Sequence, residues 1–233
     1  MIRRATSRIA TLATIVVITA IAMPGRSVAD VAARSALRFA PGSELWMEGK
    51  STVHDWESRT KTINVVFTRA AGQAAPSSTA AIEALVRSKG VRMVDVQIPV
   101  SSLHSKKKGL DKNLLKSMRA DKYPTIHFRM DRYTVVSPAT ADTLKLRLEG
   151  ALTVRGIEKP VTLDARARKG DKGVWIEGAE PLDMSDFGIK SPTMMMGTLK
   201  VKDRIVIHYR LLLAPDMAVA GVTSRSNDRK RSP

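Results

Sequence analysis

The stretch LKLRLEGALTVRGIEKPVTLDA, residues 144–165, decides the fold. Leucines alternate with charged residues in its first half, and Val161, Leu163 and Ala165 continue the alternation in its second half. Such alternation indicates β-strands with one buried face, because successive side chains along a strand point to opposite sides of the sheet. Residues 155–160, which include Gly156 and Pro160, are typical of a turn. The stretch therefore predicts two strands joined by a turn.

The same alternation recurs on both sides of this stretch. It is found in residues 44–54, 63–67, 94–98, 126–130, 174–176 and 205–211. Eight short strands in sequence order, most of them joined by turns, are typical of an antiparallel barrel or sandwich. We therefore predict an all-β protein whose strands form one of these two architectures.

Two segments replace the alternation by helical spacing of apolar residues. They are residues 80–88 and residues 111–120. Asp111 is a suitable N-cap for the second segment, because its side chain can accept a hydrogen bond from the first helical turn. We expect these short amphipathic helices to cover a barrel end or a sheet face.

The interior of such a barrel bears on function. An eight-stranded barrel is filled by its side chains or holds one slender ligand. The positions predicted to face inward are almost wholly aliphatic, with Met47 and Met130 among them, and aromatic residues make up only 4% of the chain. An enclosed ligand would therefore be an apolar chain, and an ordinary filled core is the alternative.

The N-terminal segment has the order of a secretory signal peptide. Three arginines within the first eight residues precede an uncharged apolar stretch, residues 9–22, and small residues ending at Ala29 follow a Pro-Gly break. The apolar stretch is too short to span a membrane comfortably. We predict cleavage after Ala29 and a periplasmic or secreted protein with one barrel domain, residues 30–213, and a disordered basic tail, residues 214–233.

The charge of the chain indicates anionic partners. The formal net charge is +17 and falls to +13 without residues 1–29, which hold four arginines and no acids. This charge favours lipid headgroups, a pyrophosphate or envelope polymers. Nucleic acid is the weakest candidate, because few aromatic residues are present for base stacking. The chain contains no cysteine, so it has no disulfide framework.

Four motifs follow one another along the chain. They are GKSTVHDWES (residues 49–58), VQIPVSSLHSKKKGLDKNLLKSMRADKYPTIHF (96–128), LEGALTVRGIEKPVTL (148–163) and MSDFGIKSPTMMMGTLKVKDRIVIHYRL (184–211). In this order they resemble the YceI-like family of secreted polyisoprenoid-binding proteins. The resemblance implies an extended eight-stranded antiparallel β-barrel, lipocalin-like in architecture, that holds a long isoprenoid lipid such as a quinone or a polyprenyl phosphate. It also implies no catalysis, no metal and no covalently held cofactor.

The resemblance and the strand pattern together give a set of predicted lipid contacts. They are Leu45, Met47, Val53, Trp56, Phe67, Ile98, Ile126, Phe128, Met130, Leu146, Leu148, Ile176, Phe187, Met195, Ile207 and Tyr209. Residues 70–90 form an insert relative to simpler members of the family, and we expect this insert to cover the pocket mouth or to alter what fits. Lys106, Lys107 and Lys108 are a solvated loop on the usual interpretation, and we hypothesise that they contact a headgroup or an anionic membrane surface.

Some residues also have a catalytic or metal-binding interpretation. His54 and Asp55 would be a general base and its orienting carboxylate, but no nucleophile motif accompanies them and adjacent strand residues point to opposite faces. We expect instead that both bond to turn backbone. The methionines of residues 194–196 fill a gap, contact an apolar ligand or, least expected, bind Cu(I). The four histidines lack metal-ligand spacing, so we predict no metal site.

Two alternative functions stand beside lipid carriage or storage. One is an envelope stress or interaction protein with a filled barrel and a basic binding surface. The other is a small hydrolase or isomerase that uses His54 and Asp55. The sequence leaves the oligomeric state open, a dimer included.

Overall fold

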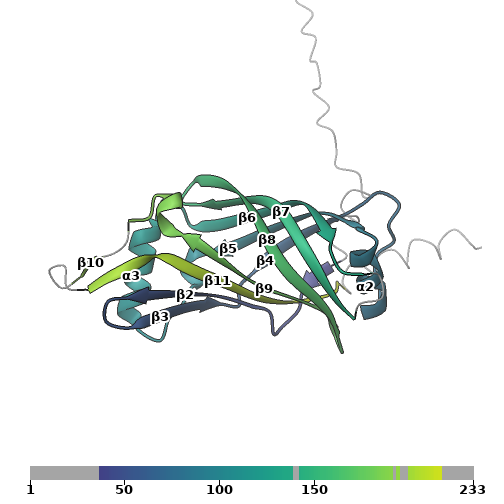
Figure 1. Ribbon diagram of the computed structural model, residues 1–233, viewed down its shortest axis with the longest axis horizontal. Helices are drawn as coiled ribbons and strands as arrows, with labels where there is room; N and C mark the ends of the chain where they lie inside the picture. The colour runs from purple at the N-terminus through teal and green to yellow at the C-terminus, as the bar shows by residue number, and fades with distance from the viewer. Residues whose placement is uncertain (1–36, 139–141, 191–192, 195–198, 217–233) are drawn as a thin grey trace, which may run out of the picture.

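A curled antiparallel sheet with a helix at each end forms the structure (Figure 1). The computed structural model describes residues 37–138, 142–190, 193–194 and 199–216. The strands are β1 (Leu37–Phe39), β2 (Glu44–Ser51), β3 (Asp55–Thr60), β4 (Asn64–Arg69), β5 (Val91–Pro99), β6 (Thr125–Val135), β7 (Thr143–Val154), β8 (Ile157–Gly170), β9 (Gly173–Asp183), β10 (Thr193–Met194) and β11 (Leu199–Pro215). The helices are α2 (Thr79–Arg87) and α3 (Lys108–Met118), with short 3₁₀ turns η1 (Val100–Ser102) and η2 (Met184–Phe187).

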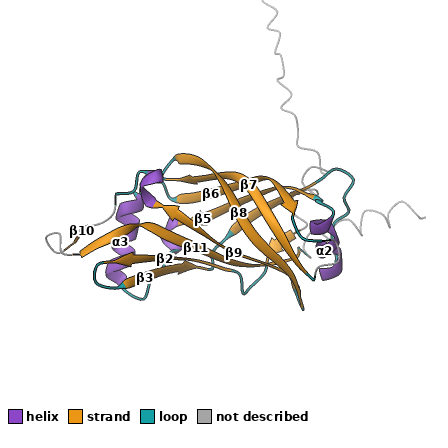
Figure 2. Cartoon of the chain, viewed as in Figure 1, coloured by secondary structure: helices purple, strands orange, loops and turns teal. Residues whose placement is uncertain are grey.

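The sheet follows the order β3-β2-β11-β9-β8-β7-β6-β5-β4, and β1 and β10 also pair with β11. Every pairing is antiparallel. The edge strands β3 and β4 are linked by other segments. Phe39 of β1 packs edge-on against Phe67 of β4, with ring centroids 5.4 Å apart. The backbones of Arg59 in β3 and His104 exchange two hydrogen bonds of 2.8 and 2.9 Å. The sheet thus curls into a barrel (Figure 2).

The β7–β8 hairpin confirms the prediction from residues 144–165. Val154 and Ile157 are the last pair of the ladder, so Arg155 and Gly156 form a two-residue turn. Both have positive φ angles, 53° and 75°, which match the right-handed twist of the flanking strands. The turn is thus shorter than the predicted residues 155–160, and Pro160 lies within β8.

The first predicted strand is instead a hairpin of two strands. β2 ends at Ser51, and the chain returns as β3 beside it. The Ser51 hydroxyl accepts from the backbone N–H of Val53 and His54 and donates to the carbonyl of His54, at 2.7 Å. Such local bonds offer the backbone an alternative to the sheet ladder. The prediction that Val53 points inward is therefore wrong, since its side chain lies in the turn and is 64% exposed.

The sequence pattern also missed two very short strands, β1 and β10. β1 has three residues and β10 has two, too few for alternation to be visible. Apart from β3, the remaining eight strands correspond to the eight predicted segments, although most extend further than predicted. The all-β antiparallel barrel is therefore confirmed, and the described residues form eleven strands in place of the predicted eight.

The two helices lie where they were predicted, but the start of the second differs. α2 is capped by the Ser78 hydroxyl, which accepts from the Ala81 N–H. α3 begins at Lys108, so Asp111 lies in its first turn and is not the N-cap. The Asp111 carboxylate instead accepts from the Ser105 N–H at 2.6 Å, holding the loop before the helix.

The predicted domain boundaries agree with the observed barrel only in part. β11 runs to Pro215, and Ala214 is 6% exposed, so these two residues pack with the barrel and not with the predicted tail. The predicted signal peptide and residues 217–233 lie outside the described residues. Within the described part of the chain, no helix has the length and apolar character needed to cross a membrane.

Candidate ligand-binding cavity

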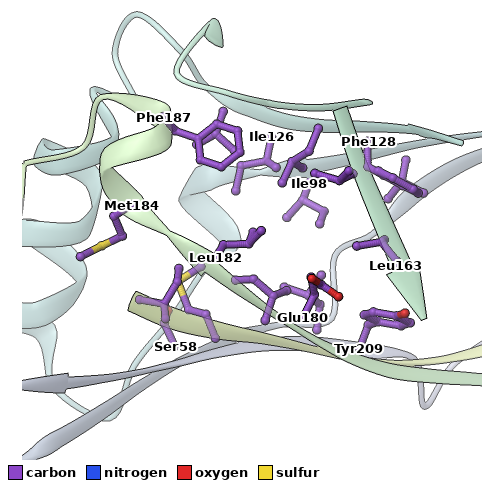
Figure 3. A pocket seen from close by; sticks show the side chains of 18 of the residues that line it. Ser58, Ile98, Ile126, Phe128, Leu163, Glu180, Leu182, Met184, Phe187 and Tyr209 are labelled. Carbon is purple, nitrogen blue, oxygen red and sulfur yellow. The ribbon is translucent and has the colours of Figure 1, made fainter. Parts of the chain in front are cut away.

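A cavity of about 540 Å³ runs inside the barrel. Strands β2–β9 and β11, helix α3 and η2 all contribute to its lining, and most of the lining side chains are apolar. Figure 3 shows Ile98, Ile126 and Phe128 on one side of the open centre and Leu182 and Tyr209 on the other. Its volume falls within the range of small-molecule pockets in proteins. The barrel is thus not fully packed by its own side chains.

Most of the predicted contact residues line this cavity. They are Leu45, Met47, Trp56, Phe67, Ile98, Ile126, Phe128, Met130, Leu146, Leu148, Ile176, Phe187, Ile207 and Tyr209. Val53 does not line it, and Met195 lies outside the described residues. Strand alternation selected most of the inward side chains correctly, because each strand presents one face to the barrel interior.

The inward side chains form rows across the wall, set by strand register. One row contains Ser58 of β3, Met47 of β2, Ile207 of β11 and Glu180 of β9, each directly opposite the next. We call it the Ser58–Glu180 row. Both of its ends are polar, whereas its centre is apolar.

Sequence reasoning missed Glu180. Its carboxyl group points into the open centre of the cavity (Figure 3). The alternation of β9 continues inward through Gly178, Glu180 and Leu182, but a glycine and a glutamate are not apolar, so the predicted strand stopped at Ile176. Burial raises the pKa of Glu180 above that of an ordinary glutamate, and the nearby charge of Asp164 adds to this rise.

Tyr209 crosses the inner face of β9 beside Glu180. Its hydroxyl donates to the Asp164 carbonyl oxygen at 3.1 Å, and a Cβ atom on Gly178 would lie 2.1 Å from that hydroxyl. The β8–β9 ladder stops at the pair Ala165–Gly178, so the phenol supplies a bond where the strands part. Burial raises the pKa of Tyr209 strongly, with the charges of Glu180 and Asp164 adding, and keeps the phenol neutral.

The end of the cavity next to α3 is its mouth, because exposed residues line it there. Trp56 lies against Gly49, where a Cβ atom would be 2.3 Å from the indole ring. Lys107 Nζ lies 3.2 Å from His54 Nε2, and both residues line the cavity. Lys106 lines a polar groove beside the mouth, and Lys108 lines neither. Contact of these lysines with a headgroup stays a prediction.

The opposite end of the cavity is covered by the insert, residues 70–90. Ile82, Leu85 and Val86 of α2 are buried in the main core, and Val86 lines the cavity. The Tyr133 hydroxyl donates to the Val86 carbonyl oxygen at 3.0 Å, fixing the helix to β6. Burial raises the pKa of Tyr133 to about 12. The insert therefore closes the end opposite the mouth.

A match to a family model shows to which family the chain belongs. Residues 32–213 match the family model of the YceI-like domain. The chain belongs to the YceI-like family. Two solved structures share the fold of this YceI-like barrel, although a comparison with curated proteins finds no match.

The first of these structures is BcnA from Burkholderia cenocepacia, 17% identical with a TM-score of 0.57, covering 76% of this chain and 99% of BcnA. The second is a polyisoprenoid-binding domain from Saccharophagus degradans implicated in plant cell wall breakdown. It is 9% identical with a TM-score of 0.56, covering 78% of this chain and 99% of the domain. At these identities the likeness shows the fold alone.

The YceI-like barrel does not bring the predicted catalytic pair together. The His54 ring contacts Lys107, and no hydrogen bond joins it to Asp55 within the described residues. The turn is held by the Ser51 hydroxyl and the backbone, so the expectation that the side chains of His54 and Asp55 hold it is wrong. The described residues contain no group of three or more His, Cys, Asp or Glu side chains placed to hold a metal ion.

Two further histidines of the YceI-like barrel, His127 and His208, have separate neighbours. His127 Nε2 lies 2.9 Å from the Asp95 carboxylate, and the His208 ring stacks on Trp46 with centroids 4.9 Å apart. Neither histidine lines the cavity. Their placement on the polar face of their strands agrees with the alternation.

Proposed function

We propose that this protein encloses a long apolar isoprenoid-type lipid in its barrel and carries or stores it outside the cytoplasm. The observation that supports this best is the unfilled apolar cavity of about 540 Å³. It favours a ligand over the alternative of a barrel filled by side chains. Membership of the YceI-like family and the fold shared with the polyisoprenoid-binding domain add support for a lipid.

The energetics suit a chain-like hydrocarbon. Moving one CH₂ group from water into an apolar environment contributes about 0.8 kcal/mol, so affinity grows with the buried length of the chain. The lining offers few polar groups that would hold water, and an apolar cavity accepts an apolar ligand readily. No catalytic step is part of this proposal.

The basic mouth supports a second element of the proposal. Lys107 borders the cavity, and Lys106 borders the groove beside it together with Lys50, Lys202 and Arg204. These cations would draw the mouth to anionic headgroups of a membrane, where the lipid is taken up or released. Export through the predicted signal peptide would place the protein beside such a surface.

Lipid extraction from the protein secreted by its native host is the decisive experiment. Organic extraction should release an isoprenoid lipid in stoichiometric amount, and mass spectrometry of the extract should identify it. A variant with a blocked cavity, Leu163→Trp, should lose that lipid. Thr162→Trp, which places the same bulk on the exposed face of β8, should keep it. A lipid-free native protein that also fails to bind added isoprenoids would overturn the proposal.

A further inference from the structure

Two polar side chains lie at one level of the apolar cavity, at the ends of the Ser58–Glu180 row. Ser58 is 2% exposed and lines the cavity, and its hydroxyl has no hydrogen-bond partner among the described residues. The Glu180 side chain is half-buried, and its carboxyl makes no hydrogen bond or ion pair within the described part of the chain. Figure 3 shows the Glu180 oxygens directed toward the open centre.

Two other polar groups in the same wall are satisfied, whereas the indole N–H of Trp56, one row nearer the mouth, also has no hydrogen-bond partner among the described residues. In the adjacent row, the Thr60 hydroxyl bonds to the Ser102 hydroxyl at 2.8 Å, and Tyr209 bonds to the Asp164 carbonyl. An unpaired buried polar group costs free energy that an apolar side chain of similar size would not. If the wall served only to hold hydrocarbon, apolar residues at positions 58 and 180 would make the protein more stable.

The depth of these groups separates them from the basic mouth. Trp56 and Leu182 stand in the next row toward α3, two residues along their strands. Two residues of a strand span about 7 Å, so the Ser58–Glu180 row lies about that far inside the Trp56 row. An anionic headgroup held by Lys107 at the mouth would therefore not reach it.

We propose that Glu180 and Ser58 form a polar seat that hydrogen-bonds a neutral carbonyl or hydroxyl oxygen within the buried part of the ligand. The inference rests on the proposed function and narrows its ligand to apolar molecules that carry such an oxygen inside the tunnel. A pure hydrocarbon would leave both groups unpaired. A phosphate at this depth would meet the acidic Glu180 and the charge of Asp164.

The charged groups around Glu180 affect the pH range in which its carboxyl group can donate a hydrogen bond. Asp164 of β8, which pairs with Arg147 on the outer face, and Tyr209 of β11 act on it electrostatically. Asp183 on the same strand also lines the cavity and pairs with Arg204. Glu57, Lys107, Asp111 and His54 line the cavity at the mouth. Burial and Asp164 both raise the pKa of Glu180, so the neutral acid persists to higher pH than usual and can donate to a carbonyl. Above that pKa the carboxylate only accepts, so ketone binding should weaken while alcohol binding persists.

The test uses three isoprenoid probes: geranylgeranylacetone as a ketone, squalene as a hydrocarbon and geranylgeranyl phosphate as an anion. Affinities are measured by calorimetry on the mature protein, freed of lipid, over a pH series. The variants are Glu180→Leu, Glu180→Gln and Ser58→Ala. Ala179→Leu is the matched control, because Ala179 is the exposed neighbour of Glu180 on β9.

We expect Glu180→Leu to weaken ketone binding by about tenfold while squalene binds as tightly or more tightly. Glu180→Gln should keep ketone affinity and abolish its fall at high pH, because the amide still donates but does not titrate. Ser58→Ala should weaken the ketone by a few-fold, and the Ala179→Leu control should change neither probe.

A Glu180→Leu variant with the ketone-to-squalene preference of the wild type would overturn the polar seat. If that variant does not fold, the pH profiles decide: identical profiles for wild type and Glu180→Gln overturn the inference. A wild type that binds none of the three probes defeats the proposed function itself, whereas binding that is insensitive to position 180 defeats only the seat.

Discussion

At the scale of single residues, Gly178 and Glu180 show how the inner face of β9 departs from a plain apolar strand. Gly178 leaves room for the Tyr209 ring, whose hydroxyl reaches the Asp164 carbonyl. Two residues further, Glu180 projects a carboxyl group into a mainly apolar cavity. Gly178 is required by the close approach of the Tyr209 ring, whereas Glu180 supplies a polar group to the cavity. Both residues interrupt the apolar alternation.

Gly178→Ala should destabilise the fold. The added Cβ would lie 2.1 Å from the Tyr209 hydroxyl and 2.7 Å from the Asp164 carbonyl oxygen, so the ring must move and its hydrogen bond is lost. Overpacking of this kind costs about 1–3 kcal/mol of unfolding free energy, measured by urea denaturation. Gly109→Ala is the control: nothing lies within 4 Å of its Cβ, and α3 should gain about 0.5–1 kcal/mol. Equal stability of the two variants would contradict this account of Gly178.

Glu180→Gln should change how stability depends on pH. The pKa of Glu180 is raised on folding, so the folded state holds this proton more tightly than the unfolded state does. Wild-type stability should therefore rise as pH falls through the raised pKa, until the ordinary value of 4.5 is reached. The glutamine variant lacks this contribution. It should be the more stable protein near neutral pH, and its advantage should shrink on acidification. Urea unfolding across pH measures this, and a constant difference would contradict it.

At the scale of elements, the two ends of the barrel are built differently. The insert with α2 closes one end by burying Ile82, Leu85 and Val86 in the core. The α3 end is bordered by exposed residues, including Lys107 and His54. The β2–β3 hairpin brings Trp56 to that end, because Ser51 turns the chain back on itself.

Ile82→Ala should loosen the closed end. Ile82 is fully buried, and removing its methyl and methylene groups leaves a cavity under α2. The expected loss is about 2–5 kcal/mol in the unfolding free energy, with faster proteolysis of residues 70–90. Glu83→Ala, which removes only the partly exposed pair with Arg87, should cost about 0.5 kcal/mol or less. A loss of similar size in both variants would mean that α2 is not held by its buried face.

At the scale of the whole molecule, an apolar interior is combined with a strongly basic chain of formal net charge +17. Many outward charges form cross-strand pairs, such as Arg147 with Asp164 and Arg168 with Glu177. Exposed pairs of this kind contribute little to stability. The basic residues around the mouth are where the charge of the chain bears on the proposed exchange of lipid with a membrane.

Neutralising Lys106, Lys107 and Lys108 together to Gln should slow lipid transfer to anionic vesicles at low salt. Each lysine near an anionic surface contributes about 1 kcal/mol, and salt screens that contribution. Transfer is measured between vesicles rich in phosphatidylglycerol, with neutral phosphatidylcholine vesicles for comparison. Replacing Lys145, Lys169 and Lys172, which are exposed and do not line the mouth, is the control of equal charge. Unchanged transfer by the Lys106–108 variant would remove the membrane-docking role.

Much of this architecture was predictable. The Leu144–Leu148 alternation and the Arg155–Gly156 turn gave a hairpin that the structure confirms, and helical spacing located α2. Local sequence patterns failed to predict the structure where a side-chain hydroxyl competed with the backbone hydrogen bonds of the sheet. At Ser51 the alternation continued into a turn, so β3 was missed and Val53 was placed inside. The residue type of Asp111 predicts an N-cap, whereas the helix starts before it.

Alternation along each strand predicts most of the side chains that face inward, although it misplaces Val53 and misses Glu180, because a period of two residues is a property of each strand alone. Only the tertiary structure decided that these side chains leave a cavity, since packing depends on how the whole sheet curls. It also decided which inward residues share a level. Ser58 and Glu180 are distant in sequence and lie at the two ends of one row, and the register of four strands, which long-range pairing alone fixes, places them there. The sequence therefore predicts the apolar barrel, but it does not predict the polar seat.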